Sequence, residues 1–136
     1  MEKKEEFQVA LLGIIFDPEK KKILIGRREK DPHIPELTWS FPGGRITPGE
    51  DVEETLKERI KKKTGLEIEN LGSVYSRIPP EKKDLLLIYF LCEVTGGKEE
   101  KADDLLELKW VDPEELEEHF TTSFHPHVKE YILNLK

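Results

Sequence analysis

Charged side chains gather between residues 43 and 66, in a pattern that suits either a metal ion or a phosphate group. Three glutamates there recur at intervals of four residues: Glu50, Glu54 and Glu58. Carboxylate oxygens are the ligands that Mg²⁺ prefers in proteins. Three cations follow at positions that share one helix face: Arg59, Lys62 and Lys63. Charged Arg and Lys offer a metal no lone pair but donate readily to phosphate oxygens. Residue types alone therefore leave two kinds of chemistry open.

The surrounding pattern places these charges on a helix that follows a glycine-rich loop. Residues 51–64 predict the helix, and its apolar stripe consists of Val52, Leu56 and Ile60. Gly65 ends the helix, because glycine tolerates the left-handed conformation that closes helices. The glycines of the preceding loop, residues 42–45, allow the backbone to approach a ligand closely.

Apolar runs elsewhere predict strands joined by short turns: residues 7–16, 22–26, 38–41, 68–78, 85–94 and 106–111. Asp112 and Pro113 begin a further helix, as N-cap and first-turn residue. Residues 124–135 predict a last helix. Strands mixed with two or three helices indicate an α+β domain with a mixed sheet, and the length indicates one domain over residues 1–136.

Composition narrows the classes of protein that this chain can belong to. The net charge of -7 argues against general nucleic-acid binding, which needs cations to neutralise phosphates. No apolar run approaches the ~20 residues needed to span a membrane, and the N-terminus is too charged for a signal peptide. The single cysteine, Cys92, excludes an internal disulfide and fits a reducing cytoplasm. Abundant charge with few amide side chains is typical of proteins from heat-loving organisms.

The combined motifs resemble those of the Nudix family. The family pattern is G-x5-E-x7-R-E-U-x-E-E-x-G-U, where U is a bulky aliphatic residue. The matching positions are Gly44, Glu50, Ile60, Gly65 and Leu66. Further stretches typical of the family occur in the right order at residues 23–28, 39–44 and 110–116. The resemblance implies the Nudix α/β/α sandwich with a mixed β-sheet.

The resemblance also implies a chemistry that this chain departs from. Nudix proteins usually hydrolyse a nucleoside diphosphate linked to another moiety, with Mg²⁺ held by the glutamates of R-E-U-x-E-E. Here those positions carry Arg59, Lys62 and Lys63, and the Arg-Glu pair is inverted. A lysine ammonium ~5 Å from Mg²⁺ opposes binding by at most several kcal/mol at an effective dielectric of about 20. We therefore expect the usual magnesium site to be absent, and metal-dependent pyrophosphohydrolase activity to be weak or relocated.

One alternative is a hydrolase whose metal site is rebuilt from other carboxylates, with Mg²⁺ or Mn²⁺ as cofactor. Glu50 and Glu58 are its candidate catalytic residues, and Glu54 is a further candidate ligand. In the family an arginine usually pairs with the loop glutamate, so Glu58 would repel Glu50 unless Arg59 or a metal lies between them. More distant candidates are Glu53, Glu99, Glu100, Asp103 and Asp104. The competing interpretation is that these carboxylates form a solvated surface.

The other alternative is a catalytically inactive Nudix-fold domain that binds a nucleotide, another phosphorylated ligand or a protein partner. The candidate ligand-binding residues are Arg27, Gly43, Gly44, Arg45, Arg59, Lys62 and Lys63. The competing interpretation is that residues 61–63 form an exposed basic helix end that interacts favourably with the helix dipole. The family resemblance also allows a homodimer, although no pattern identifies an interface. His33 is in the 31–35 loop, which borders the ligand cleft in the family, and we do not expect it to be catalytic. His119, His125 and His127 lack the spacing of metal ligands and suit surface or helix-start roles.

Overall fold

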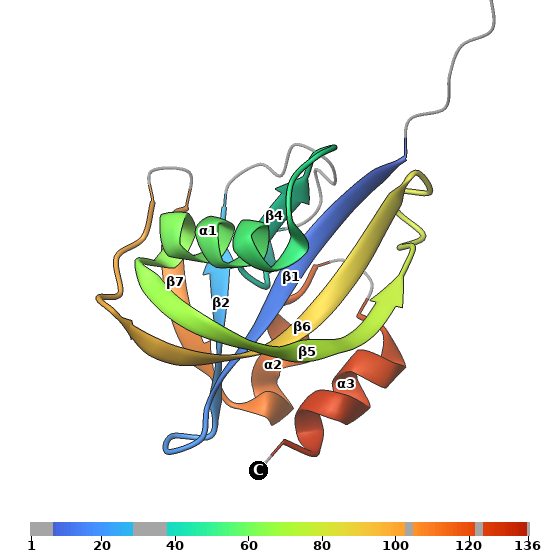
Figure 1. Ribbon diagram of the computed structural model, residues 1–136. Helices are drawn as coiled ribbons and strands as arrows, with labels where there is room; N and C mark the ends of the chain where they lie inside the picture. Colours follow the sequence, from blue (N-terminus) through green and yellow to red (C-terminus); the bar gives the residue numbers. More distant parts are fainter. Residues whose placement is uncertain (1–6, 29–37, 103–104, 122–123, 136) are drawn as a thin grey trace, which may run out of the picture.

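The computed structural model describes residues 7–28, 38–102, 105–121 and 124–135 (Figure 1). Its strands are β1 (Gln8–Asp17), β2 (Lys22–Arg27), β3 (Trp39–Ser40), β4 (Gly43–Ile46), β5 (Leu66–Arg77), β6 (Leu85–Gly97) and β7 (Glu107–Val111). Its helices are α1 (Val52–Thr64), the 3₁₀ turn η1 (Pro113–Glu115), α2 (Leu116–His119) and α3 (Pro126–Leu133). His33, Asp103 and Asp104 lie outside the described residues.

Strand β1 organises the sheet because it has different partners along its length. It runs parallel to β6, with Gln8 opposite Leu85 and Ile15 opposite Cys92. On its other side the first half of β1 pairs with β4, and its end pairs with β2, both antiparallel. The strand order is β3-β2-β1-β6-β5, with β7 also paired to β2. The sheet is therefore mixed, as predicted.

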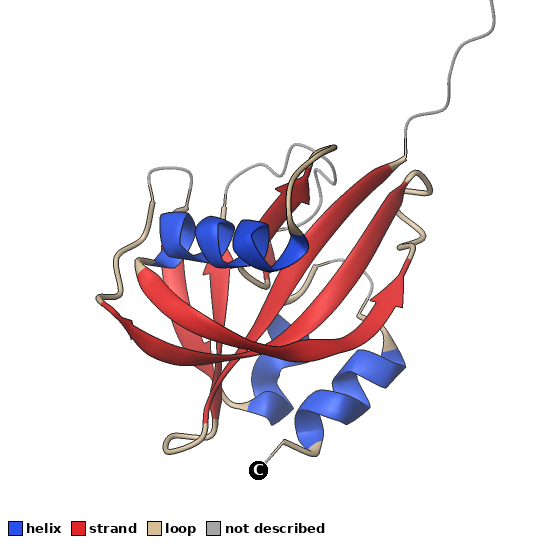
Figure 2. Cartoon of the chain, in the orientation of Figure 1, coloured by secondary structure: helices blue, strands red, loops and turns tan. Residues whose placement is uncertain are grey.

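Helices cover both faces of the sheet, with α1 on one face and α2 and α3 on the other (Figures 1 and 2). Successive residues of β1 point to opposite faces, as the pleat of a strand requires. Ile15 packs with Leu56 and Ile60 under α1, whereas Ile14 packs with Val128 and Ile132 under α3. The α/β/α sandwich is thus built on two apolar clusters that share one sheet.

Helix α1 is the element that carries the candidate site. Its C-terminal end at Gly65 matches the prediction, whereas Asp51, predicted as the first helical residue, is the N-cap. The Asp51 carboxylate accepts a hydrogen bond of 3.0 Å from the Glu54 backbone N–H, and Gly65 closes the helix with φ +78°. The predicted apolar stripe was wrong at its first position, because Val52 is 43% exposed. The buried face instead extends to Thr64, whose hydroxyl donates to the Ile60 carbonyl at 2.7 Å and so meets its own hydrogen-bonding need.

The C-terminal region is more broken than its sequence predicted. The helix expected after Asp112 is a 3₁₀ turn followed by the four-residue α2, and α3 occupies only residues 126–133 of the predicted 124–135. Strand β6 runs on to Gly97, three residues beyond the predicted strand 85–94. None of the helices in the described ranges has the length and apolar character needed to cross a membrane.

Candidate functional site

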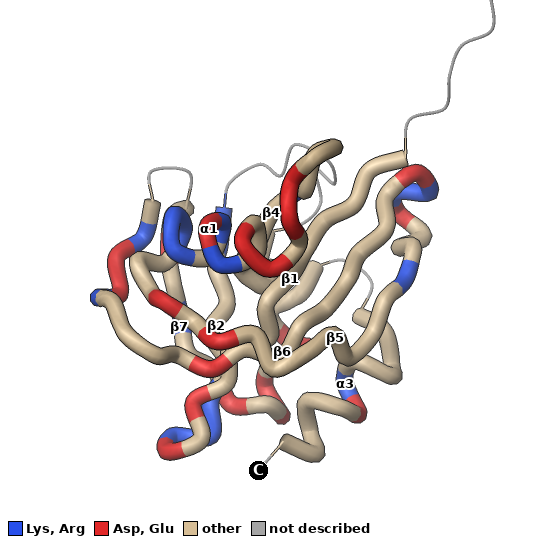
Figure 3. Tube along the Cα trace, in the orientation of Figure 1, with Lys and Arg blue, Asp and Glu red and all other residues tan. Residues whose placement is uncertain are grey.

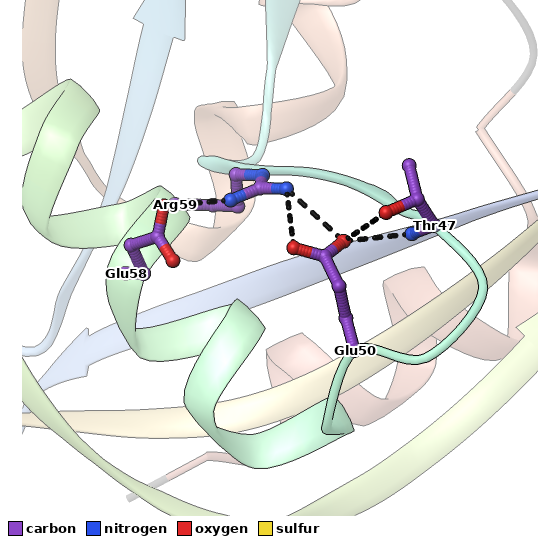
Figure 4. A network of polar contacts seen from close by, with 4 residues as sticks. All are labelled: Thr47, Glu50, Glu58 and Arg59. Carbon is purple, nitrogen blue, oxygen red and sulfur yellow. Dashed lines mark hydrogen bonds and ion pairs between the residues drawn. The ribbon is translucent and has the colours of Figure 1, made fainter.

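The loop before α1 and the middle of that helix bring three of the predicted site residues into one polar network (Figure 4). The Arg59 Nη2 group lies 3.3 and 3.2 Å from the two carboxylate oxygens of Glu50. Its Nη1 group donates to Glu58 Oε1 at 2.8 Å. Arg59 therefore lies between Glu50 and Glu58, which the sequence predicted to repel each other, and its guanidinium supplies positive charge to both.

Glu50 is also held by the loop itself. The backbone N–H and the hydroxyl of Thr47 donate to Glu50 Oε1 at 2.8 and 2.7 Å. The hydroxyl bond, followed by the backbone bond, lowers the pKa of Glu50, and the charge of Arg59 lowers it further against the opposing effect of desolvation. The Glu50 carboxylate is consequently a poor proton acceptor at neutral pH. Sequence reasoning missed Thr47, although a threonine three residues before an acidic residue is a recognisable turn signal.

Arg59 is packed as well as paired. A Cβ added to Gly44 would lie 3.0 Å from Arg59 Cδ, so the glycine makes room for the arginine stem. The side chains of Arg59 and Glu50 are 23% and 30% exposed, whereas Glu58 is 66% exposed. Water screens the Glu58 pair more strongly, and we expect the Glu50 pair to fix the arginine.

The remaining predicted ligand-binding residues are dispersed. Gly43 is buried where β4 pairs with β1, and a Cβ there would collide with the Leu11 carbonyl oxygen. Arg27 forms a separate pair with Glu107 at 3.5 Å, and its guanidinium lies 5.8 Å from the centre of the Trp39 ring. Arg45 and Lys62 are exposed, and Lys63 is half-buried. Glu54 shares α1 with the network but has its side chain outside it.

The donor set of this site does not fit Mg²⁺. The helix positions that would face the ion carry Arg59, Lys62 and Lys63, none of which offers a lone pair when charged. The carboxylates of Glu50 and Glu58 are already bonded to a guanidinium that essentially never loses its proton. Across residues 7–28, 38–102, 105–121 and 124–135, no three His, Cys, Asp or Glu side chains form a group able to hold a metal.

A hollow opens beside the C-terminal end of α1. Its volume is about 730 Å³, and it is lined by Lys61, Lys62, Gly65, Lys98, Glu100, Lys101 and Ala102. Acidic residues occupy the first turn of α1 and lysines its last turn, so this end of the helix is basic (Figure 3). Sequence reasoning missed Lys98 and Lys101, because the segment after β6 reads as a solvated charged loop.

Comparisons with known proteins agree with the motif and the fold. A model of the NUDIX domain matches residues 6–132. The ADP-ribose pyrophosphatase of Methanocaldococcus jannaschii is 34% identical over 107 residues, which are 76% of this chain and 61% of that protein. A putative 8-oxo-dGTP diphosphatase of Bacillus subtilis is 34% identical over 104 residues, 74% of this chain and 64% of that protein. The chain thus spans less than two thirds of the length of these curated relatives.

Solved structures share the architecture at low sequence identity. A MutT protein from Methanosarcina mazei superposes with a TM-score of 0.72 and 16% identity, covering 97% of this chain and 94% of that one. A NUDIX hydrolase from Nitrosomonas europaea gives a TM-score of 0.75 at 15% identity, covering 96% and 73%. These likenesses establish the fold. Because the family model spans almost the whole sequence, this chain belongs to the NUDIX domain family, as its motifs predicted.

Proposed function

We propose that this chain is a Nudix-fold domain that binds a nucleotide or a related phosphorylated compound through cations, and that its metal-dependent pyrophosphohydrolase activity is weak or absent. The observation that supports this proposal is the position of Arg59, which is bonded to both Glu50 and Glu58. An ion entering this network would have to displace a permanent cation that is already well hydrogen-bonded.

The same charges that oppose a metal favour an anionic ligand. Lys62 is exposed on the helix, and a lysine ammonium offers three donors to phosphate oxygens. Charge-assisted hydrogen bonds of this kind are roughly twice as strong as bonds between neutral groups. The ligand class follows from the relatives, whose names refer to ADP-ribose and to 8-oxo-dGTP. Both compounds carry linked phosphates, so they are the first ligands to test on this chain.

The test compares binding and turnover in one set of preparations. Calorimetry in EDTA measures the affinity for ADP-ribose and for 8-oxo-dGTP, and product release is followed during a titration with Mg²⁺ or Mn²⁺. We expect binding without metal, weaker binding in Lys62→Glu, and little or no turnover above the protein-free rate. Strong metal-dependent cleavage by the purified wild-type protein would overturn the proposal.

A fourfold variant provides the matched positive control. Glu58→Arg, Arg59→Glu, Lys62→Glu and Lys63→Glu together restore the family pattern on the same helix. Because three carboxylates, at positions 59, 62 and 63, then share one helix face, we expect Mg²⁺ affinity to appear that the wild type lacks. Calorimetric titration with Mg²⁺ measures this gain. If no gain appears, the charges on α1 are not what separates this chain from a magnesium-binding one.

A second candidate function is hydrolysis at a metal site rebuilt from Glu50, Glu54 and Glu58. The observation that favours it is the 34% identity with a protein named as an ADP-ribose pyrophosphatase. This candidate predicts turnover of ADP-ribose that requires metal and disappears in Glu50→Gln or Glu58→Gln. The first proposal predicts that Glu50→Gln and Glu58→Gln leave metal-dependent turnover at the same weak or undetectable level as in the wild type.

A further inference from the structure

The hollow at the end of α1 concentrates positive charge contributed by two separate segments. Lys61 and Lys62 come from the helix, and Lys98 and Lys101 come from the segment that follows β6. Four lysines and one glutamate give the lining a formal charge of +3. A basic concavity of this kind on a chain of net charge -7 is a local feature that the overall composition conceals.

The segment after β6 is fixed against the helix by its backbone. The N–H of Glu100 donates to the Thr64 carbonyl at 2.7 Å, and the N–H of Ala102 donates to the Lys63 carbonyl at 3.3 Å. The approach is close, because a Cβ added to Gly65 would collide with the Lys98 carbonyl oxygen. The backbone that carries Lys98 and Lys101 is therefore already fixed before a ligand binds, so little conformational entropy is lost in ordering it.

The helix dipole does not account for this arrangement. It explains lysines in the last turn of α1, but Lys98 and Lys101 are not part of the helix. Three of the last four carbonyls of α1, those of Lys61, Lys63 and Thr64, already accept hydrogen bonds from the N–H groups of Gly65, Ala102 and Glu100. Within the described ranges Lys61 is paired with Glu67 at 3.6 Å, whereas the other three lysines of the hollow have no ion-pair partner. Like charges in excess of their counter-charges oppose folding, and an anionic ligand would relieve that repulsion.

We propose that this hollow binds the linked phosphates of a nucleoside diphosphate compound, with Lys62, Lys98 and Lys101 as donors to phosphate oxygens. This inference rests on the proposed function and locates its ligand. Two linked phosphates match the lining better than one, because their charge is spread along a chain that can meet both segments. Glu100 lies in the same lining and can accept a hydrogen bond from a ligand hydroxyl, which favours a nucleotide sugar over bare polyphosphate.

Calorimetry in EDTA at low salt tests the location with two probes, ADP-ribose and inorganic tripolyphosphate. The test variant is Lys98→Gln with Lys101→Gln, which removes both loop charges. The matched control is Lys20→Gln with Lys83→Gln, which removes the same charge from exposed turn positions outside the hollow. We expect the test variant to lose at least about tenfold in affinity for both probes, and the control to change by less than about threefold.

A third variant separates the two probes. Glu100→Gln raises the formal charge of the lining by one, so tripolyphosphate should bind more tightly. ADP-ribose should gain less, because a hydroxyl acceptor is weakened at the same time. Thermal unfolding of the unliganded variants checks that they are folded, and removal of like charges should leave the Lys98→Gln, Lys101→Gln protein at least as stable as the wild type.

The outcomes distinguish this inference from the proposed function. If the wild type binds ADP-ribose without metal and the loop variant binds it equally well, the hollow is not the ligand site, although the proposed function stands. If the wild type binds neither probe in EDTA, the proposed function fails and this inference fails with it. Equal losses in the loop variant and the turn control would show that net charge alone governs binding, which also overturns the location.

Discussion

Substitution of Gly65 tests whether the segment after β6 is as closely docked on α1 as the proposed ligand site requires. Gly65 has φ +78°, and a Cβ there would meet the Lys98 carbonyl oxygen and lie 3.0 Å from the Glu100 nitrogen. Gly49 provides the matched control, because its φ is +87° and a Cβ there meets nothing within 4 Å. The two positions share left-handed backbone and differ in the space available.

The expected loss of stability follows from the backbone strain and from the space available for a Cβ at each position. An L-residue in the left-handed region costs about 1–2 kcal/mol, which is the whole expected cost of Gly49→Ala. At Gly65 the backbone of the docked segment must also shift, which adds about 1–3 kcal/mol by analogy with overpacking. For a chain of 136 residues, 1 kcal/mol lowers the melting temperature by about 3.5 °C. We therefore expect a decrease of roughly 3–7 °C for Gly49→Ala and roughly 7–17 °C for Gly65→Ala.

Calorimetric melting of four variants separates backbone strain from collision. Asparagine tolerates the left-handed conformation, so Gly49→Asn should be nearly neutral. Gly65→Asn still carries a Cβ and should remain strongly destabilised. Tripolyphosphate binding should also weaken in the folded fraction of both Gly65 variants, because the loop lysines are displaced. The reasoning is refuted if Gly65→Ala is no more destabilising than Gly49→Ala, or if asparagine rescues both positions.

Three further predictions concern other parts of the fold. Desolvation lowers the pKa of His125, and so do the nearby charges of Arg77 and His127. The stability contributed by neutral His125 is therefore complete above its unfolded pKa of about 6.5 and is lost as pH falls through its folded pKa. The unfolding free energy should decline below that pH, and decline less in His125→Asn, which keeps an N-cap acceptor. A Cβ at Gly13 would lie 2.7 Å from Ile60 Cδ1, so Gly13→Ala should cost about 1–3 kcal/mol, and a double-mutant cycle should show partial rescue by Ile60→Val. Burial raises the pKa of the Cys92 thiol to about 12, so a thiol reagent should modify the protein only as fast as it unfolds.

Local chemistry is enough to predict α1, but not how it sits on the sheet. The spacing of Leu56 and Ile60 marks its buried face, and Gly65 marks its end. Val52 fits the same spacing and is nevertheless exposed, because burial depends on the strands beneath each turn of the helix. The parallel pairing of β1 with β6 joins segments far apart in the chain, and no local pattern encodes it.

The candidate site, like the fold, can be predicted only in part from the sequence. The inversion at Glu58 and Arg59 is visible in the sequence, and it correctly raises the question of what lies between Glu50 and Glu58. The answer depends on Thr47, which orients Glu50 toward the helix. Lys98 and Lys101 look like surface residues until the close approach of their backbone to Gly65 brings them to the end of α1.

The ion pair between loop and helix has a consequence for any metal chemistry at this site. Moving an arginine by one residue turns it about 100° around a helix, yet Arg59 still reaches Glu50 and ties the loop to α1. A metal held by Glu50 and Glu58 would have to break the bonds of that arginine to both glutamates, and the loop would lose its anchor. The Thr47 amide, which donates to Glu50, reports this directly through hydrogen exchange. Faster exchange of that amide on addition of Mg²⁺ would favour a rebuilt metal site, whereas an unchanged rate is what a domain that binds phosphates through cations requires.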